Sequence, residues 1–228
     1  MRSRSPRGSL SREVVLDAAL ALIDRVGVDH LSVRGLADEL ARPPMTLYSH
    51  FDSKQALLDL AFAHLVHRLF VTHRHATWQA ELEAACRHIR RELVGHPHWV
   101  ALLTRVRVPS SALHVYDHLL GLMLEDGFRP EAAMFAFSSI ISHALGSALA
   151  ERLMDGKPSV PQQRLKLVRG MLADGPRGAF PRIEAVSSKF DRWTFDRVFE
   201  VGLRSLVTGL DESSPRRKGY RRSSRRAG

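Results

Sequence analysis

Apolar residues recur at spacings of three and four along most of the chain, which is the period of an amphipathic α-helix. In the first such segment, Ser11 occupies the position of an N-cap, and Gly27 follows the last apolar turn, as glycine does just beyond a helix C-terminus. The sequence has no internal repeat and none of the alternation of apolar and polar residues that predicts strands. It therefore predicts an all-α fold.

The segment from Ser32 to Lys54 predicts two short helices joined by a tight turn, with a third helix beginning at its end. The apolar residues of the first helix share one face, and Ser32 stands at its N-cap position. Ala41-Arg42 forms the turn. Pro43-Pro44 then opens the second helix, because proline is tolerated at the first helical positions, where no N–H group is needed.

The second of these helices is short and presents a polar face. Leu47 and Phe51 lie four residues apart and can be buried together, which turns the polar residues of the helix outward. The outward residues are Thr46, Ser49 and His50. A short second helix with a polar face is the design of a helix-turn-helix, whose second helix enters the major groove of DNA.

The same segment resembles the tetracycline-repressor (TetR) family of transcription factors. The resemblance rests on Leu31-Ser32-x-Arg34-x-Leu36-Ala37 followed by Thr46-Leu47-Tyr48-x-His50-Phe51-x-x-Lys54, about a quarter of the chain with the preceding helix. It implies an N-terminal three-helix DNA-binding domain and a C-terminal helical domain for ligand binding and dimerisation. It also implies a homodimer that binds a palindromic double-stranded DNA operator, responds to a small molecule and by default represses.

The resemblance also assigns DNA contacts to the positions that match the family motif. Tyr48 and Lys54 would bind phosphates, and Arg34 would read a guanine with two hydrogen bonds. Two other interpretations stay open, since Tyr48 could pack into the domain and His50 could be a structural hydrogen-bonding residue. The matching positions are Ser32, Arg34, Thr46, Tyr48, His50 and Lys54.

The segment departs from the family pattern around the turn. Ala41 stands where the family commonly has glycine, so we expect mild backbone strain there. Arg42 could read bases, and the three residues after it carry no side-chain donor but could contact thymine methyl groups. These are Pro43, Pro44 and Met45, which we add to the predicted DNA-binding residues together with Arg42.

The remaining hydrophobic pattern predicts a larger helical body. We expect helices over 54–72, 78–94, 99–105, 112–125, 131–154 and 193–210, and a long connection over 156–190 with a short helix near 163–172. The predicted organisation is a basic disordered arm at 1–10, the helix-turn-helix domain at 11–54, the ligand-binding and dimerisation domain at 55–211 and a basic disordered tail at 212–228.

Two of these helices have apolar patterns that suggest packing against a second copy of the chain. The helix over 131–154 is apolar or small nearly all round, so we expect it to be buried. The helix over 193–210 carries an apolar stripe that includes glycines, which usually mark close packing. This pattern fits either an intramolecular core or a homodimeric four-helix bundle, and the resemblance favours the bundle. The predicted interface residues are Phe137, Ile141, Phe195, Phe199, Gly202 and Leu206.

The tetracycline repressor that gives the family its name binds a magnesium–drug chelate through two histidines and a glutamate. His143 and Glu151 resemble two of these ligands, whereas the third position falls at Leu103, which cannot bind a metal. We therefore expect a more apolar organic effector and no cofactor. The positions predicted to bind it are Phe70, Ala85, Ile89, Leu103, Arg107 and His143.

Other interpretations of the histidines remain open. His143 is equally well interpreted as a satisfied core or interface residue. A metal-responsive regulator could use His143 with Glu151, or the pairs His64/His67 and His114/His118, whose spacing places two ligands on one face.

The distribution of charge along the chain offers a second interpretation of how the protein binds DNA. The net charge of +10 comes from the ends, since 1–12 and 213–228 carry eleven basic and no acidic residues, leaving 23 basic and 24 acidic residues between them. Such ends are typically disordered but would attract DNA phosphates. A ligand-independent protein that binds DNA mainly through these ends is therefore the rival interpretation.

The remaining observations concern the compartment and catalysis. Cys86 is the only cysteine, so no internal disulfide is possible, and we expect it to be a small core residue. We find no export signal and expect no membrane span, which favours a cytoplasmic protein. Phosphate-binding, nucleophile-elbow and zinc-protease motifs are absent from the sequence, so we do not expect an enzyme.

Overall fold

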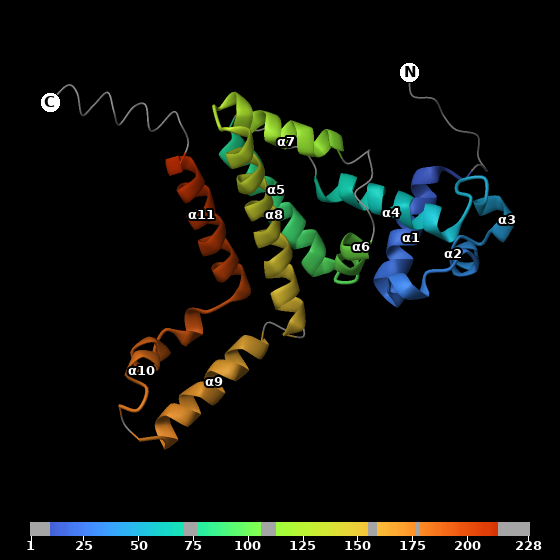
Figure 1. Ribbon diagram of the computed structural model, residues 1–228. Helices are drawn as coiled ribbons and strands as arrows, with labels where there is room; N and C mark the ends of the chain where they lie inside the picture. Colours follow the sequence, from blue (N-terminus) through green and yellow to red (C-terminus); the bar gives the residue numbers. More distant parts are fainter. Residues whose placement is uncertain (1–9, 71–76, 106–112, 155–158, 177, 214–228) are drawn as a thin grey trace. The chain divides into compact units, whose positions relative to one another are not determined.

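The computed structural model describes residues 10–70, 77–105, 113–154, 159–176 and 178–213 (Figure 1). These residues form helices and no strand, which confirms the predicted all-α fold. The helices are α1 (Arg12–Val26), α2 (Val33–Glu39), α3 (Pro44–Leu47), α4 (Lys54–Leu69), α5 (Trp78–Gly95), α6 (Trp99–Arg105), α7 (Leu113–Glu125), α8 (Pro130–Leu153), α9 (Ser159–Asp174), α10 (Pro181–Ser187) and α11 (Phe195–Ser213), with 3-10 turns at Val28–His30 and Phe190–Arg192. Contacts divide the chain into two compact units, residues 1–73 with 95–118 and residues 74–94 with 119–228.

The first unit is built around α1, which begins and ends as its sequence predicts. The Ser11 hydroxyl accepts a hydrogen bond from the Val14 N–H at 3.3 Å, and Gly27 ends the helix with φ of +83°. Helices α4 and α6 pack on α1, and the Trp99 indole N–H donates to the Leu20 carbonyl at 3.3 Å. The compact unit therefore extends further along the chain than the predicted helix-turn-helix domain at 11–54.

The second unit includes α5, α8 and α11. Helix α8 packs along α11, and Cys86 of α5 is fully buried, with its thiol donating to the Ile140 carbonyl of α8 at 3.6 Å. Burial raises the pKa of Cys86 to about 12, so this thiol stays protonated and inert. The expectation that Cys86 is a small core residue is confirmed.

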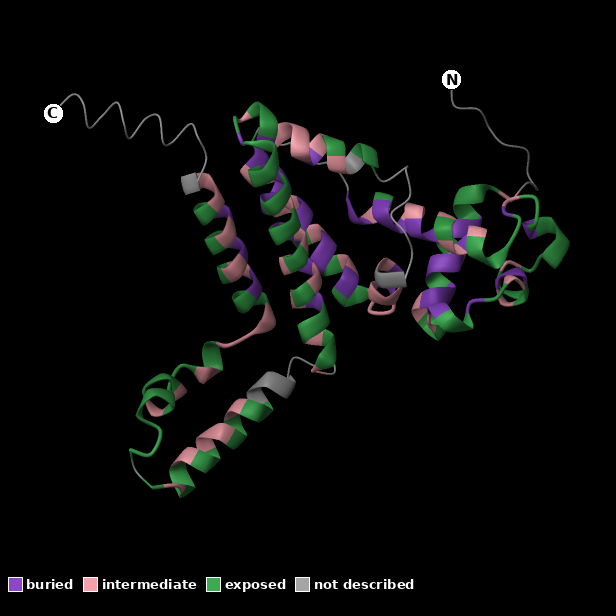
Figure 2. Ribbon diagram, in the orientation of Figure 1, coloured by how far each residue is buried: buried purple, intermediate pink, exposed green. Residues whose placement is uncertain are grey.

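Helix α8 is less buried than its composition suggests (Figure 2). Its length and its mean hydropathy of 1.5 make it the one helix among the described residues that could cross a membrane by length and composition, a property that core helices of globular proteins share. Only one face is buried within the chain, so burial of the other faces stays a prediction that requires the partner of the bundle interpretation. The buried residues of α8 are Ala133, Ala136, Ile140, Ala144 and Ala148.

The stretch 156–190 is not the long connection that its glycine and proline content suggests. It contains the 16-residue helix α9 and the 7-residue helix α10. Arg169 of α9 holds the pair together, because its guanidinium donates to the Ser187 carbonyl at 2.8 Å and forms an ion pair with Asp191 at 3.0 Å. A tertiary contact across 18 to 22 residues thus orders a segment that local patterns assign to a loop.

Candidate functional site

Helix α2 and the turn after it form the first half of the helix-turn-helix. The Ser32 hydroxyl caps α2 by accepting from the Gly35 N–H at 3.0 Å. At the other end, the Ala41 N–H donates to the Asp38 carbonyl at 3.1 Å and the Arg42 N–H to the Ala37 carbonyl at 3.0 Å. These two bonds form a Schellman motif, in which the residue after the C-cap must adopt a left-handed conformation.

Ala41 is that left-handed residue, with φ of +49°. We expect Ala41→Gly to raise the free energy of unfolding by roughly 0.5–1 kcal/mol, because a left-handed L-residue costs about 1–2 kcal/mol and the entropy lost by glycine offsets part of the gain. Urea unfolding measures the difference. Gly27→Ala is the opposite control and should destabilise, since Gly27 has φ of +83°. Equal stability of Ala41→Gly and wild type would show that the turn carries no strain.

Helix α3 exposes polar and apolar side chains next to one another on the surface of the first unit. Pro43 is its N-cap and Pro44 its first residue, as predicted, while Leu47 and Phe51 are buried and hold the helix against the core. The Ser49 hydroxyl donates to the Thr46 carbonyl at 2.7 Å. The exposed residues around it are Arg42, Pro43, Pro44, Met45, Thr46, Tyr48 and Ser49, and His50 is half-buried.

The cationic residues of this segment differ in their surroundings. Arg34 and Arg42 are exposed and have no ion pair with any described residue. Lys54 is the first residue of α4, whose N-cap is Ser53, and its ammonium group donates to the Asp29 carbonyl at 3.3 Å. The ten predicted DNA-binding residues therefore lie in one continuous segment of the first unit, although Ser32 uses its hydroxyl for capping. Their contacts with DNA stay a prediction.

The predicted effector residues fall in both compact units. In the first unit, Phe70 is buried and packs edge-to-face on Tyr116 with ring centres 5.5 Å apart, and Leu103 is half-buried. In the second, Ala85 and Ile89 are buried residues of α5. Arg107 lies outside the described residues. A common binding site for this set stays a prediction.

His143, the last predicted effector residue, has partners within its own unit. Its Nε2 donates to the Phe199 carbonyl of α11 at 3.0 Å, and its ring stacks on the Phe199 ring with centres 5.1 Å apart. A Cβ atom at Gly202 would lie 2.5 Å from the imidazole. Gly202 therefore permits the close packing that its position in the apolar stripe indicated, and the interpretation of His143 as a satisfied interhelical histidine is supported.

Two of the residues considered for a metal site have partners within the chain. Glu151 accepts a hydrogen bond from Arg90 at 2.7 Å, while His64 pairs with Asp17 at 2.8 Å. Within the described parts of the chain, no three histidine, cysteine or acidic side chains come together in a way that could hold a metal ion.

Helices α8 and α11 carry the predicted dimer residues at different depths. Phe199 and Gly202 are turned towards His143 inside the unit, whereas Phe137, Ile141, Phe195 and Leu206 are half-buried. The predicted interface set leaves out several exposed apolar residues on the same two helices. The lack of charge between 132 and 150 was the signal that could have found the residues on α8. The residues left out are Met134, Phe135, Leu149 and Leu153 on α8 and Val198 and Val201 on α11.

Two family models match the chain. The model described as "Bacterial regulatory proteins, tetR family" matches residues 15–61, and the model described as "Tetracyclin repressor-like, C-terminal domain" matches residues 72–213. The first match contains α2 and α3 with the turn between them, and the second extends over most of the rest of the chain.

Individual proteins agree with these matches. The class A tetracycline repressor protein of transposon 1721 from Escherichia coli is 30% identical over 204 residues, covering 88% of this chain and 90% of its own length. A possible TetR family regulator from Streptomyces coelicolor A3(2) is 25% identical with a TM-score of 0.66, covering 89% and 100% of the two chains. ActR of Streptomyces coelicolor, solved in complex with actinorhodin, shares the fold with a TM-score of 0.70 at 23% identity, covering 91% and 100%. The chain therefore belongs to the tetracycline-repressor (TetR) family of bacterial regulatory proteins.

Proposed function

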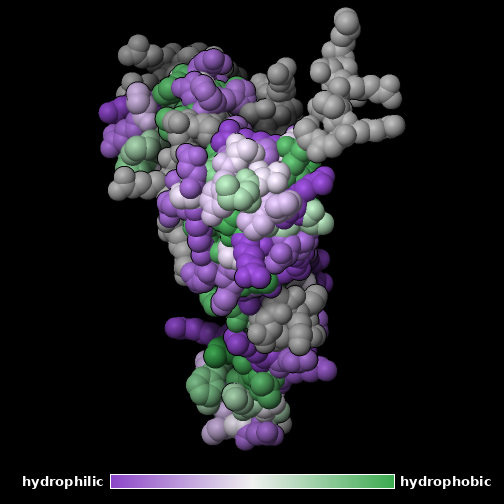
Figure 3. Space-filling view, turned by 90° about the vertical axis from the view of Figure 1, so that its right-hand side faces the viewer, coloured by the Kyte–Doolittle hydropathy of each residue, from purple (hydrophilic) through white to green (hydrophobic). Residues whose placement is uncertain are grey.

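We propose that this protein is a dimeric, sequence-specific repressor that leaves a palindromic operator when a small, largely apolar organic molecule binds its C-terminal region. The exposed surface of α3 is the observation that supports DNA binding. This surface is continuous with Arg42, and both belong with Arg34 to the family's DNA-binding motif. Figure 3 shows a mostly hydrophilic face of the molecule. The target of such a protein is chromosomal DNA, so we place it in the cytoplasm.

We assign the roles in DNA reading from the chemistry of each exposed group. Arg34 is exposed and has no ion pair among the residues that the structure describes, so its guanidinium is suited to the O6 and N7 atoms of guanine. Met45 is 77% exposed and, with the two prolines before it, can contact thymine methyl groups. Tyr48 and Lys54 bind phosphates and fix the register of α3 in the groove.

Arg34→Ala tests the direct reading of bases. We expect a loss of about 1–3 kcal/mol of operator binding for each half-site, together with relaxed preference at one base pair. Fluorescence anisotropy with the operator and its single-base variants measures both effects. Because Arg34 is exposed and unpaired, the melting temperature should stay unchanged. Undiminished preference at every operator position would contradict the assignment.

The proposed effector is an apolar organic compound. Phe70, Ala85 and Ile89 are apolar and buried, and Leu103 cannot contribute a metal ligand. ActR, which shares the fold, was solved in complex with actinorhodin, so the fold accommodates that ligand in ActR. The hydrogen bonds of His143 and Glu151 within the chain argue against a magnesium-chelating drug and against a metal-responsive regulator that uses these two residues.

The function is tested by selecting fragments of the organism's own genome with the purified protein, followed by footprinting at moderate salt. We expect a short palindrome near the gene or its neighbours, and the enzymes or transporters encoded there shortlist the effector. Deletion of 1–9 and 214–228 should weaken binding without changing the selected sequence. Selection of no common sequence, or complete loss of binding without the ends, would support the ligand-independent alternative instead.

A further inference from the structure

Residues 10–70, which the structure describes, contain one exposed arginine that neither folding nor the predicted DNA contacts explain. Residues 10–70 include six Lys or Arg and eight Asp or Glu residues, so a free cation is not the default in this region. Arg25 forms an ion pair with Glu39, and Arg68 lies 3.9 Å from Asp17. Among the described residues, three arginines of this stretch have no ion pair and are exposed: Arg12, Arg34 and Arg42. Two of them belong to the predicted DNA-reading surface, and the third is Arg12.

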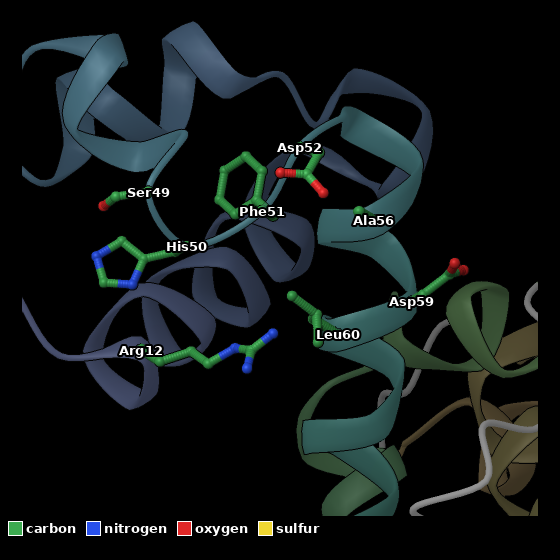
Figure 4. A pocket seen from close by; sticks show the side chains of 8 residues that line it. All are labelled: Arg12, Ser49, His50, Phe51, Asp52, Ala56, Asp59 and Leu60. Carbon is green, nitrogen blue, oxygen red and sulfur yellow. The ribbon is translucent and has the colours of Figure 1, made fainter.

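Arg12 lies at a hollow of about 320 Å³ that begins where the exposed surface of α3 ends (Figure 4). Arg12 comes from the first turn of α1, and Ser49 and His50 come from the chain that leaves α3. Figure 4 shows the Arg12 side chain extending from α1 towards Leu60 of α4, with Ser49 and His50 on one side of the hollow and Asp59 on the other. Asp59 accepts a hydrogen bond from Gln55 at 2.9 Å. The hollow thus combines the cationic Arg12 with the polar side chains that follow α3.

We propose that this hollow receives a DNA backbone phosphate that flanks the half-site, with Arg12 as its charged ligand and Ser49 and His50 as polar neighbours. This inference rests on the proposed operator binding. A helix in the major groove is bordered by the two phosphate backbones, and segments that flank the recognition helix meet them. Since Ser49 and His50 border both α3 and the hollow, a backbone leaving the groove along α3 reaches Arg12 next.

The acidic residues of the hollow indicate a phosphodiester rather than a free phosphate. Asp52 and Asp59 also line the hollow, so an anion with two charges that filled it would be repelled. A phosphodiester carries one charge and is fixed by the rest of the duplex, so it can present its oxygens to Arg12 alone. Inorganic phosphate should therefore weaken operator binding only by raising the ionic strength. Its effect should equal that of chloride at the same ionic strength.

The test compares Arg12→Gln with wild type on the selected operator across a salt series. Each lost phosphate contact lowers the slope of log K against log salt by about 0.9, so we expect a decrease of about 1.8 for a dimer. Base preference should not change. Arg182→Gln is the matched control, because it removes the same charge from an exposed position. Arg182 lies on α10 and has no ion pair among the described residues. Arg12→Lys should keep most of the wild-type slope.

Ethylation interference identifies the phosphate itself. In wild type, ethylation of one phosphate at the edge of each half-site should block binding, and Arg12→Gln should be insensitive to that ethyl group while all other interferences persist. Folding is not a confounder, because losing a cation from the first turn of a helix is neutral or slightly stabilising. An unchanged slope and an unchanged interference pattern in a protein that still binds its operator would overturn the inference. Absence of any operator would instead contradict the proposed function.

Discussion

Replacing Phe135 by glutamate is expected to produce a folded monomer with greatly reduced affinity for the operator. Phe135 is 59% exposed on α8, and no charged residue lies between 132 and 150, so this face has the character of an interface that lacks its partner. In a two-fold symmetric interface the substitution introduces two carboxylates, each of which must be desolvated. A monomer binds one half-site, and the loss of linked binding costs about 10²- to 10⁴-fold in affinity.

Sedimentation velocity measures the oligomeric state and anisotropy measures operator binding. Leu124→Glu is the matched control, because Leu124 is 44% exposed on α7 and its substitution adds the same charge to an apolar position. Circular dichroism should show that both variants keep their helices, since Phe135 contributes little to the core of its own chain. A stable Phe135→Glu dimer with wild-type operator affinity would place the interface elsewhere, and α9 with its exposed Leu167 and Met171 would be the next surface to test.

The parts of the fold that follow from local signals could be predicted from the sequence. Ser11 and Gly27 mark the ends of α1, and Pro43-Pro44 marks the start of α3, because caps and proline act within one helical turn. The same proline signals misled at 156–190. Pro161 and Pro181 lie in the first turns of α9 and α10, where proline is tolerated, so they mark helix starts within a supposed loop.

The candidate site was predictable to the extent that it is one continuous segment. The exposed surface of α3 follows from the burial of Leu47 and Phe51, which a four-residue spacing already indicates. Pairing between distant residues is not encoded in spacing. The sequence therefore left His143 between two interpretations, which its contact with Phe199, 56 residues away, helps to decide. For the same reason it gave no basis for singling out Arg12, since only the fold shows which arginines are neutralised by acidic neighbours.

Arg90→Met is expected to lower the free energy of unfolding by about 1–3 kcal/mol, the usual cost of leaving a partly buried polar or charged group without its hydrogen-bond partner. Arg90 is 9% exposed, donates to Glu151 at 2.7 Å and lies 4.8 Å from the centre of the Phe199 ring. Its second acidic partner, Asp196 at 2.8 Å, has a side chain 81% exposed, so that ion pair contributes little. Urea unfolding at neutral pH should show the loss, and methionine keeps most of the side-chain volume.

The loss should also depend on pH in a predictable direction. Burial raises the pKa of Glu151 above its ordinary value of 4.5, and Arg90 partly opposes this shift, so removing Arg90 raises the pKa further. The folded variant then binds a proton more tightly than the unfolded chain. Its stability is highest below the ordinary pKa of glutamate and falls as pH rises to the raised folded-state pKa. The difference between Arg90→Met and wild type should therefore shrink on acidification from neutral pH to about pH 5.

A double variant separates the unpaired carboxylate from the lost packing of the guanidinium. Arg90→Met with Glu151→Gln removes both charges and leaves a neutral amide, so it should regain much of the stability and lose the pH dependence of the single variant. Glu151→Gln alone is expected to destabilise, because it leaves the Arg90 guanidinium in a largely buried position with only the exposed Asp196 as an acidic partner. If the double variant were no more stable than Arg90→Met, the contribution of Arg90 would lie in its contact with Phe199 rather than in the ion pair.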